Sequence, residues 1–157
     1  MNLTKLLCLS ALSFSMASFA DQTSINKANL YGSWQCDHDF SDPNKNLKIN
    51  FNYTINLINN GTSVGNATLL FAMGGMPQLQ YKEADTALWS LKGDQLQFVS
   101  NNIQFINVSH PELEQLLNLK QLFPKSVNET VKVLELSKKH IKIQSKQHND
   151  AYTCLKI

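Results

Sequence analysis

The stretch 47–57 constrains the possible folds of this chain more than any other segment. Apolar and polar side chains alternate along it without a break: Leu47, Ile49, Phe51, Tyr53, Ile55 and Leu57 are separated by Lys48, Asn50, Asn52, Thr54 and Asn56. Successive side chains of a strand point to opposite faces, whereas a helix would scatter this pattern around its axis. The pattern therefore predicts a strand about 36 Å long, with one face buried and the other in water.

The residues after this strand predict a hairpin and a series of further strands. Asn60-Gly61 suits a type I′ turn, because both residues tolerate positive φ. The returning strand, 62–73, carries small residues at one end of its apolar face and large ones at the other, which is typical of a tapering sheet. Gly74-Gly75-Met76-Pro77 ends that strand, and Lys92-Gly93-Asp94 predicts a second hairpin turn. Further strands are predicted at 78–83, 86–92, 95–100, 102–107, 129–136, 140–146 and 150–156, and a loop at 37–44.

The segment from Ser109 to Phe123 predicts a helix. Ser109 and Glu112 have the spacing of a capping box, Pro111 falls in the first turn, and Pro124 follows the leucine-rich turns. We expect this helix to cover one end or an open edge of the sheet; a mobile lid or a partner-binding element is the alternative. Short strands in hairpin order with one short helix predict an all-β domain over 30–157, an antiparallel up-and-down β-barrel of about eight to ten strands.

The first twenty residues have the features of a secretory signal peptide, and 21–29 form a short polar N-terminal tail. Lys5 supplies the positive region, Leu6–Leu12 the apolar region, and Ser18-Phe19-Ala20 the small residues of a cleavage site. A membrane anchor is the alternative, but serines interrupt the apolar stretch, which is short for a span. The segment therefore predicts a protein of the Gram-negative periplasm or a secreted protein.

The amino-acid usage bears on the source and on nucleic-acid binding. All fourteen basic residues are lysine, and asparagine and isoleucine are abundant, a bias expected of an AT-rich genome. The absence of arginine argues against a dedicated nucleic-acid binder, because such proteins commonly use arginine forks. In a bacterium, the Asn-x-Ser/Thr sequons would be accidental; after the predicted cleavage they occur at Asn52, Asn60, Asn66, Asn107 and Asn128.

Two cysteines remain after the predicted cleavage. Removal of 1–20 would take away Cys8 and leave Cys36 near one end of the domain and Cys154 near the other. In an oxidising compartment this pair predicts one disulfide, with a reactive or metal-binding thiol pair as the alternative.

Three segments carry a resemblance to a known family. Leu30-Tyr31-Gly32-Ser33-Trp34 is similar to the Gly-x-Trp opening of the lipocalin and calycin-like superfamily. The segment 87–96, with its Trp-x-x-x-Gly-Asp-x-Leu hairpin, and the segment 134–143 followed by Tyr152-Thr153-Cys154 resemble small secreted bacterial lipocalin-like domains. The resemblance implies a β-barrel, often with a ligand cavity or a protein-binding rim, and usually no catalysis. It also implies a basic side chain over Trp34, for which Lys156 or Lys146 would serve.

Signatures of catalysis are absent from the sequence. It contains no Gly-x-Ser-x-Gly, His-Glu-x-x-His, phosphate-binding glycine loop or Cys-x-x-Cys, so we predict a protein that is not an enzyme and uses no cofactor or metal. The best polar constellation is Asp37-His38-Asp39 with His148 and Asp150, which could hold a hydrated metal near the disulfide. Solvated loop residues are the preferred interpretation of this group.

Two functions fit these features, and an enzyme with an unrecognised site is the third alternative. The first is a periplasmic, non-enzymatic, lipocalin-like binding protein for a small apolar or lipid-like ligand, which needs a preformed cavity. The second is a periplasmic protein inhibitor, of the toxin-immunity or envelope-hydrolase type, which needs exposed anchors such as Met73 and Met76 at a rim. The same methionines could instead pack under the helix. The candidate ligand- or partner-binding residues are Phe71, Met73, Met76, Trp89, Leu116 and Phe123, although Trp34 and Trp89 are also typical core residues.

Overall fold

The computed structural model describes residues 25–117, 121, 123–146 and 150–157. The predicted signal peptide, residues 21–24 of the predicted tail, and His148 lie outside the described residues. No helix among the described residues is both long and apolar enough to cross a membrane.

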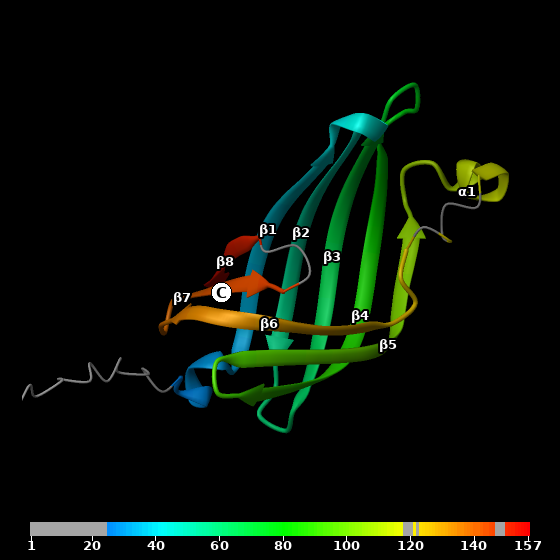
Figure 1. Cartoon of the computed structure of the whole chain (residues 1–157). Coiled ribbons are helices and arrows are strands. Elements are labelled where there is room, and N and C mark those ends of the chain that lie inside the picture. Colours follow the sequence, from blue (N-terminus) through cyan, green and yellow to red (C-terminus); the bar gives the residue numbers. More distant parts are fainter. Residues whose placement is uncertain (1–24, 118–120, 122, 147–149) are drawn as a thin grey trace, which may run out of the picture.

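Eight antiparallel strands form a closed barrel in which each strand pairs with its neighbours in the sequence and β8 returns to β1 (Figure 1). The strands are β1 (Gly32–Asp42), β2 (Leu47–Leu57), β3 (Thr62–Met73), β4 (Leu79–Lys92), β5 (Gln95–Asn107), β6 (Val127–Leu136), β7 (His140–Ser145) and β8 (Ala151–Lys156). The 3₁₀ helices η1 (Lys27–Leu30) and η2 (Pro43–Lys45) flank β1, and the short helix α1 (Pro111–Leu117) follows β5. The predicted fold class, an all-β up-and-down barrel with one short helix, is confirmed.

Three sequence predictions of strand boundaries are wrong. The predicted loop 37–44 instead belongs largely to β1, which runs to Asp42. Its outward carboxylates accept hydrogen bonds from β2: Asp37 from the Asn52 side chain, and Asp39 from Asn50 Nδ2 at 2.6 Å. Polar residues that look like a loop in the sequence therefore form the wet face of a strand.

The strand candidates 78–83 and 86–92 form the single strand β4, and 95–100 and 102–107 form the single strand β5. The pairing of β4 with β5 shifts between Thr86 and Leu88, so that the ladder absorbs an extra residue of β5. The β-bulge lets β5 continue as one strand although its inward residues change from even-numbered positions, Leu96 to Ser100, to odd-numbered positions, Ile103 to Asn107.

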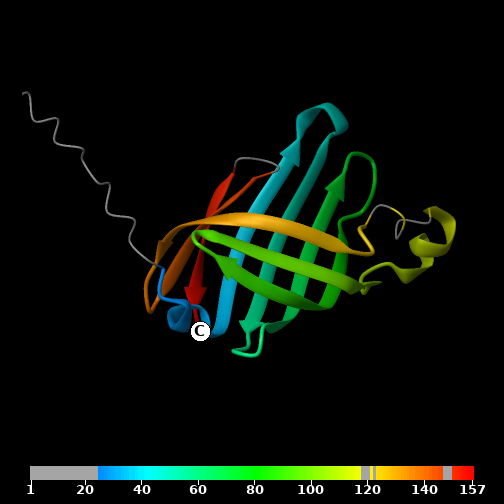
Figure 2. The same ribbon diagram turned by 60° about the horizontal axis from the view of Figure 1, so that its bottom comes forward.

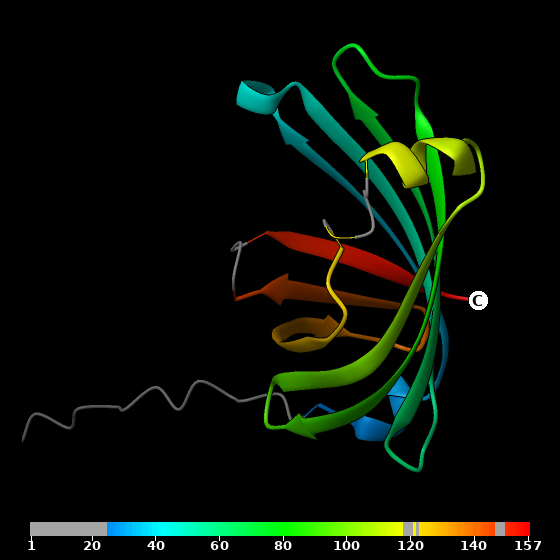
Figure 3. The ribbon, with the colours of Figure 1, turned by 90° about the vertical axis from the view of Figure 1, so that its right-hand side faces the viewer.

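The barrel has two levels, which we call the ring and the trough. In the ring all eight strands pair, but β1 meets β8 only from Trp34 to Cys36, and β5 meets β6 only from Gln95 to Ser100. Beyond those points, β1–β5 continue as a five-stranded trough, while β6–β8 remain at the level of the ring (Figure 3). Among the described residues, the 37–42 part of β1 and the 101–107 part of β5 have a strand partner on one side only.

The floor of the ring is filled around Trp34, which is 1% exposed. Its indole Nε1 donates a hydrogen bond to the Leu30 carbonyl of η1 at 2.7 Å. Lys156 Nζ lies 4.9 Å from the centre of the Trp34 ring and donates to the Asn29 carbonyl at 3.1 Å. The family resemblance implied such a lysine, and it is Lys156. The C-terminal strand and η1 thus close the same end of the barrel (Figure 2).

The disulfide predicted between Cys36 and Cys154 is present. The two cysteines are opposite each other in the last residue pair that joins β1 to β8. The bridge therefore lies at the point where the barrel closes on itself.

The helix begins later than the sequence predicts. The Ser109 hydroxyl accepts the backbone N–H of Gln80 at 2.8 Å, so the predicted capping box with Glu112 is wrong. Asn107 takes the anchoring role, since its side chain accepts the N–H groups of Ser109 and His110 and donates to the His110 carbonyl. Beyond Leu117, only Gln121 and Phe123 of the predicted helix lie within the described residues.

The alternating residues of 47–57 share the inner face, as predicted, but they are not equally buried. Ile55 and Leu57 are buried in the ring core, whereas Leu47, Ile49, Phe51 and Tyr53 remain partly exposed to an internal cavity. A side chain that lines a cavity loses less apolar contact on truncation than one sealed in a core.

Phe51→Ala should therefore lower the free energy of unfolding by about 1–2 kcal/mol, below the 3–5 kcal/mol typical of a fully buried phenylalanine. The matched variant on the outer face of the same strand, Lys48→Ala, removes an exposed side chain and should change it by less than about 0.5 kcal/mol. Urea titration of the two variants measures both values. A loss of the full core magnitude at Phe51 would show that this part of the barrel is filled.

Candidate ligand-binding site

The barrel encloses a cavity of about 690 Å³. Its floor is Trp34 and Leu96 in the ring, and its mouth lies at Phe40, Lys45 and Pro124 at the open end of the trough. This volume is within the range of sites that bury most of a small organic ligand.

The wall of the upper cavity is apolar and continuous. It is formed by inward side chains of β2, β3 and β5, which are Leu47, Ile49, Phe51, Leu69, Phe71, Met73 and Phe105. Phe123, from the segment after α1, closes this wall by stacking on Phe105 with ring centres 4.4 Å apart and by contacting Tyr81 at 4.7 Å. The connection between β5 and β6 therefore covers the unpaired side of the trough with an aromatic side chain.

The structure brings together part of the predicted site. Phe71, Met73 and Phe123 line the cavity. Met76 packs in the same apolar cluster but does not line the cavity, and Leu116 lies in α1 with its side chain outside the described residues.

Trp89 lies away from these residues, in the wall of the ring. It is 4% exposed, and its Nε1 donates to the carbonyls of Ile58 and Thr62 at 3.1 and 2.8 Å. Trp89 also contacts Tyr31 edge-on, with ring centres 6.0 Å apart. These contacts give Trp89 the environment of a core residue.

A polar band crosses the cavity between the ring and the trough. On one side, Tyr53 Oη donates a hydrogen bond to Asp85 Oδ1 at 3.1 Å, and Glu83 lies two residues from Asp85 on the same face of β4. A Cβ atom on Gly65 would lie 1.8 Å from Asp85 Oδ1 and 2.2 Å from Tyr53 Oη. Glycine at this position therefore makes the room that the Tyr53–Asp85 pair occupies.

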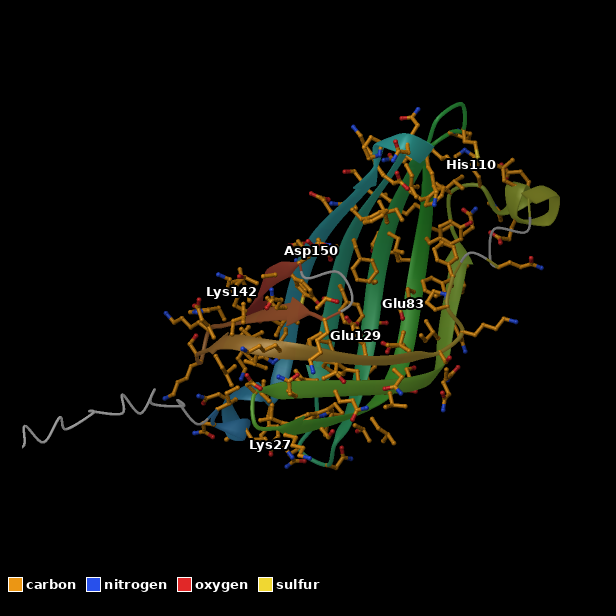
Figure 4. The ribbon with its side chains drawn as sticks, viewed as in Figure 1. Lys27, Glu83, His110, Glu129, Lys142 and Asp150 are labelled. Carbon is orange, nitrogen blue, oxygen red and sulfur yellow. A yellow bond between two sulfur atoms is a disulfide. The ribbon has the colours of Figure 1, made fainter. Side chains whose placement is uncertain are left out.

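The other side of the band is formed by β6, β7, β8 and β1. Ser145 Oγ donates to Glu129 Oε1 at 3.1 Å, and the rings of His38 and Tyr152 are 5.5 Å apart. Glu83 of β4 and Glu129 of β6 both lie at mid-height of the barrel (Figure 4). The cavity thus has apolar ends and an acidic, hydroxyl-rich middle.

Burial shifts the titration of several of these groups. Desolvation, reinforced by the charge of Asp85, raises the pKa of Glu83 to about 7. Desolvation also raises the pKa of Asp85, although hydrogen bonds from Tyr53 and Gly65 oppose the rise. Burial and the neighbouring carboxylates raise the pKa of Tyr53, and burial raises the pKa of Tyr152 to about 12. Both tyrosines therefore remain protonated hydrogen-bond donors.

The metal constellation weighed from the sequence does not converge. Asp37 and Asp39 face outward to asparagines of β2, while His38 faces the cavity. Asp150 lines a side pocket with His38, and His148 lies outside the described residues. Within the described ranges, no group of three histidine, cysteine, aspartate or glutamate side chains could hold a metal ion.

Sequence reasoning missed the acidic middle of the cavity. Glu83 and Asp85 occupy every-second positions of β4 in phase with Leu79, Tyr81, Ala87 and Trp89, all of which are buried. Two carboxylates on an otherwise apolar face are the signal that could have found them, but the predicted break of the strand at 84–85 hid that face.

Comparison with known proteins adds no identification: no family model matches this chain, and no curated protein matches its sequence. What the structure defines is a disulfide-bonded antiparallel β-barrel with an internal, largely apolar cavity.

Proposed function

We propose that this protein is a non-enzymatic binding protein of the periplasm that holds a small apolar or lipid-like ligand inside its barrel. The observation that carries the proposal is the cavity of about 690 Å³, whose upper wall is made of aliphatic and aromatic side chains. Burial of an apolar ligand against such a wall is favourable in proportion to the area removed from water.

A location outside the cytoplasm is supported by two features. The protein has a disulfide between Cys36 and Cys154. Disulfides persist in oxidising compartments and are rare in the cytosol. The first twenty residues have the composition of a secretory signal peptide.

The alternative, a protein inhibitor, has less support. The side chains that could anchor a partner at the rim, Met73 and Met76, are partly buried in a cluster with Leu113 and Phe123. Phe40, which is 46% exposed at the mouth, is a further apolar side chain that a partner could contact. Native mass spectrometry of protein purified from its own cells separates the two functions: a lipid-sized adduct supports the binder, and a stoichiometric protein partner lost on Met76→Asp supports the inhibitor.

The cavity can be tested with a neutral fluorescent dye such as Nile red. Ile103 of β5 lines the cavity, whereas Ile106 of the same strand is 58% exposed on the outside. Ile103→Trp places a large ring in the binding volume, so we expect dye affinity to fall at least about tenfold. Ile106→Trp should leave it within about twofold.

Equal affinities for both variants, measured by fluorescence titration with their folding checked by circular dichroism, would place the dye outside the barrel. Absence of dye binding to the wild-type protein, together with absence of any adduct in native mass spectrometry, would count against the binding function itself.

A further inference from the structure

One buried carboxylate oxygen in the acidic middle of the cavity has no hydrogen-bond partner among the described residues. Asp85 accepts the Tyr53 hydroxyl, and Glu129 accepts the Ser145 hydroxyl. Glu83 is 7% exposed, and its Oε2 accepts no hydrogen bond from any described residue. A buried acceptor left without a donor is costly, so its presence calls for an explanation such as a bound group.

Little positive charge faces these carboxylates. Lys45 is the only lysine among the described residues that line the cavity, and it lies at the mouth with its Nζ 3.7 Å from Asp42 Oδ2. The chain has no arginine. The other titratable groups that line the cavity below its mouth are Asp85, Tyr53, Tyr152, Glu129 and His38, and none of them carries a fixed positive charge.

We infer that the ligand is a cationic amphiphile, with an apolar body along the trough and a protonated amine that donates a hydrogen bond to Glu83. This inference rests on the proposed binding function and narrows its ligand class. An anionic head group, such as a fatty-acid carboxylate, would instead be buried beside Glu83, Asp85 and Glu129 with no cation to compensate it. A neutral alcohol would satisfy the Glu83 acceptor but would gain no charge pairing.

The proposed contact also predicts a movement of protons. A bound ammonium group beside Glu83 favours the ionised carboxylate and so opposes the desolvation that raises the pKa of Glu83 to about 7 in the free protein. Binding near neutral pH should therefore release a proton from Glu83 to solvent. An alcohol with the same alkyl chain should release none.

The test uses three probes of one chain length: octylammonium, octanol and octanoate, each titrated calorimetrically into the wild-type protein near neutral pH. We expect octylammonium to bind at least about tenfold more tightly than octanoate. Repeating the titration in buffers of different ionisation enthalpy should show proton release with octylammonium alone.

The variant Glu83→Gln should weaken octylammonium binding at least about tenfold and leave octanol within about twofold. Glu135→Gln is the matched control, because the Glu135 side chain is 58% exposed on β6, and it should change neither affinity. The wild-type comparison of the three probes does not depend on how the variants fold.

Octanoate binding as tightly as octylammonium, or octylammonium binding unchanged in Glu83→Gln, would overturn the cationic ligand and leave the binding function standing. If neither Nile red nor any of the three alkyl probes binds the wild-type protein, the binding function fails as well.

Discussion

Replacing Cys36 and Cys154 together with serine should lower the free energy of unfolding by about 2–5 kcal/mol. The bridge links residues 118 apart in the sequence, so it removes a large amount of chain entropy from the unfolded state. It also lies in a short seam, in which three residue pairs, Trp34–Lys156 through Cys36–Cys154, and the Ile157 N–H to Ser33 carbonyl hydrogen bond join β8 to β1. The loss should appear in urea titration as a lower midpoint.

The double variant and the chemically reduced wild-type protein should unfold at the same urea concentration, because both lack the same covalent link. Hydrogen exchange should show that the backbone amides of β8 lose protection before those of β3 and β4, which pair along most of their length. An unchanged midpoint in both samples would mean that the seam is stable without the bridge.

Glu83→Gln should change the pH dependence of stability in the free protein. The folded state holds the Glu83 proton more tightly than the unfolded state does, since the pKa rises from 4.5 to about 7. Its contribution to stability is therefore fully present below pH 4.5 and is lost as the pH rises through about 7. The full difference corresponds to about 3 kcal/mol.

The glutamine variant has no proton to lose at this position. Relative to the wild-type protein, it should therefore gain about 3 kcal/mol of stability between acidic pH and pH 8. Glu112→Gln, at an exposed position of α1, serves as the control and should track the wild-type curve. Urea titrations at several pH values measure these differences. If the free energy of unfolding of Glu83→Gln and of the wild type changed with pH in parallel, folding would not raise the pKa of Glu83.

Much of the fold could be predicted because its signals are local. The alternation over 47–57 and the turns at Asn60-Gly61 and Lys92-Gly93-Asp94 define hairpins, and hairpins in succession define an up-and-down barrel. The second half of β1 could not be predicted in this way. Its aspartates are stabilised in a strand by asparagines of β2, and that pairing exists only once the register is known.

In the candidate site, too, the residues with local sequence signals could be predicted, and those brought together by the tertiary fold could not. Phe71, Met73 and Phe123 were predicted because large apolar side chains next to a glycine-rich loop and a helix indicate a rim or a lid, and all three line the cavity. Glu83, Asp85 and Glu129 come from two strands that are distant in the sequence, and they converge only after the barrel has closed. Their burial is a tertiary property, so local polarity alone assigns them to the surface.

The division of the barrel into ring and trough separates the part that closes the barrel from the part that sets the length of the cavity. The disulfide and the Trp34 floor lie in the ring, whereas most of the apolar wall lies in the trough. The two edge strands of the trough, the outer parts of β1 and β5, each pair with a strand on one side only among the described residues. Lengthening or shortening the ends of β1–β2 and β3–β4 at the mouth by two residues would keep every side chain on its own face. Small insertions or deletions at the mouth can therefore change the length of the cavity without altering the closure of the ring.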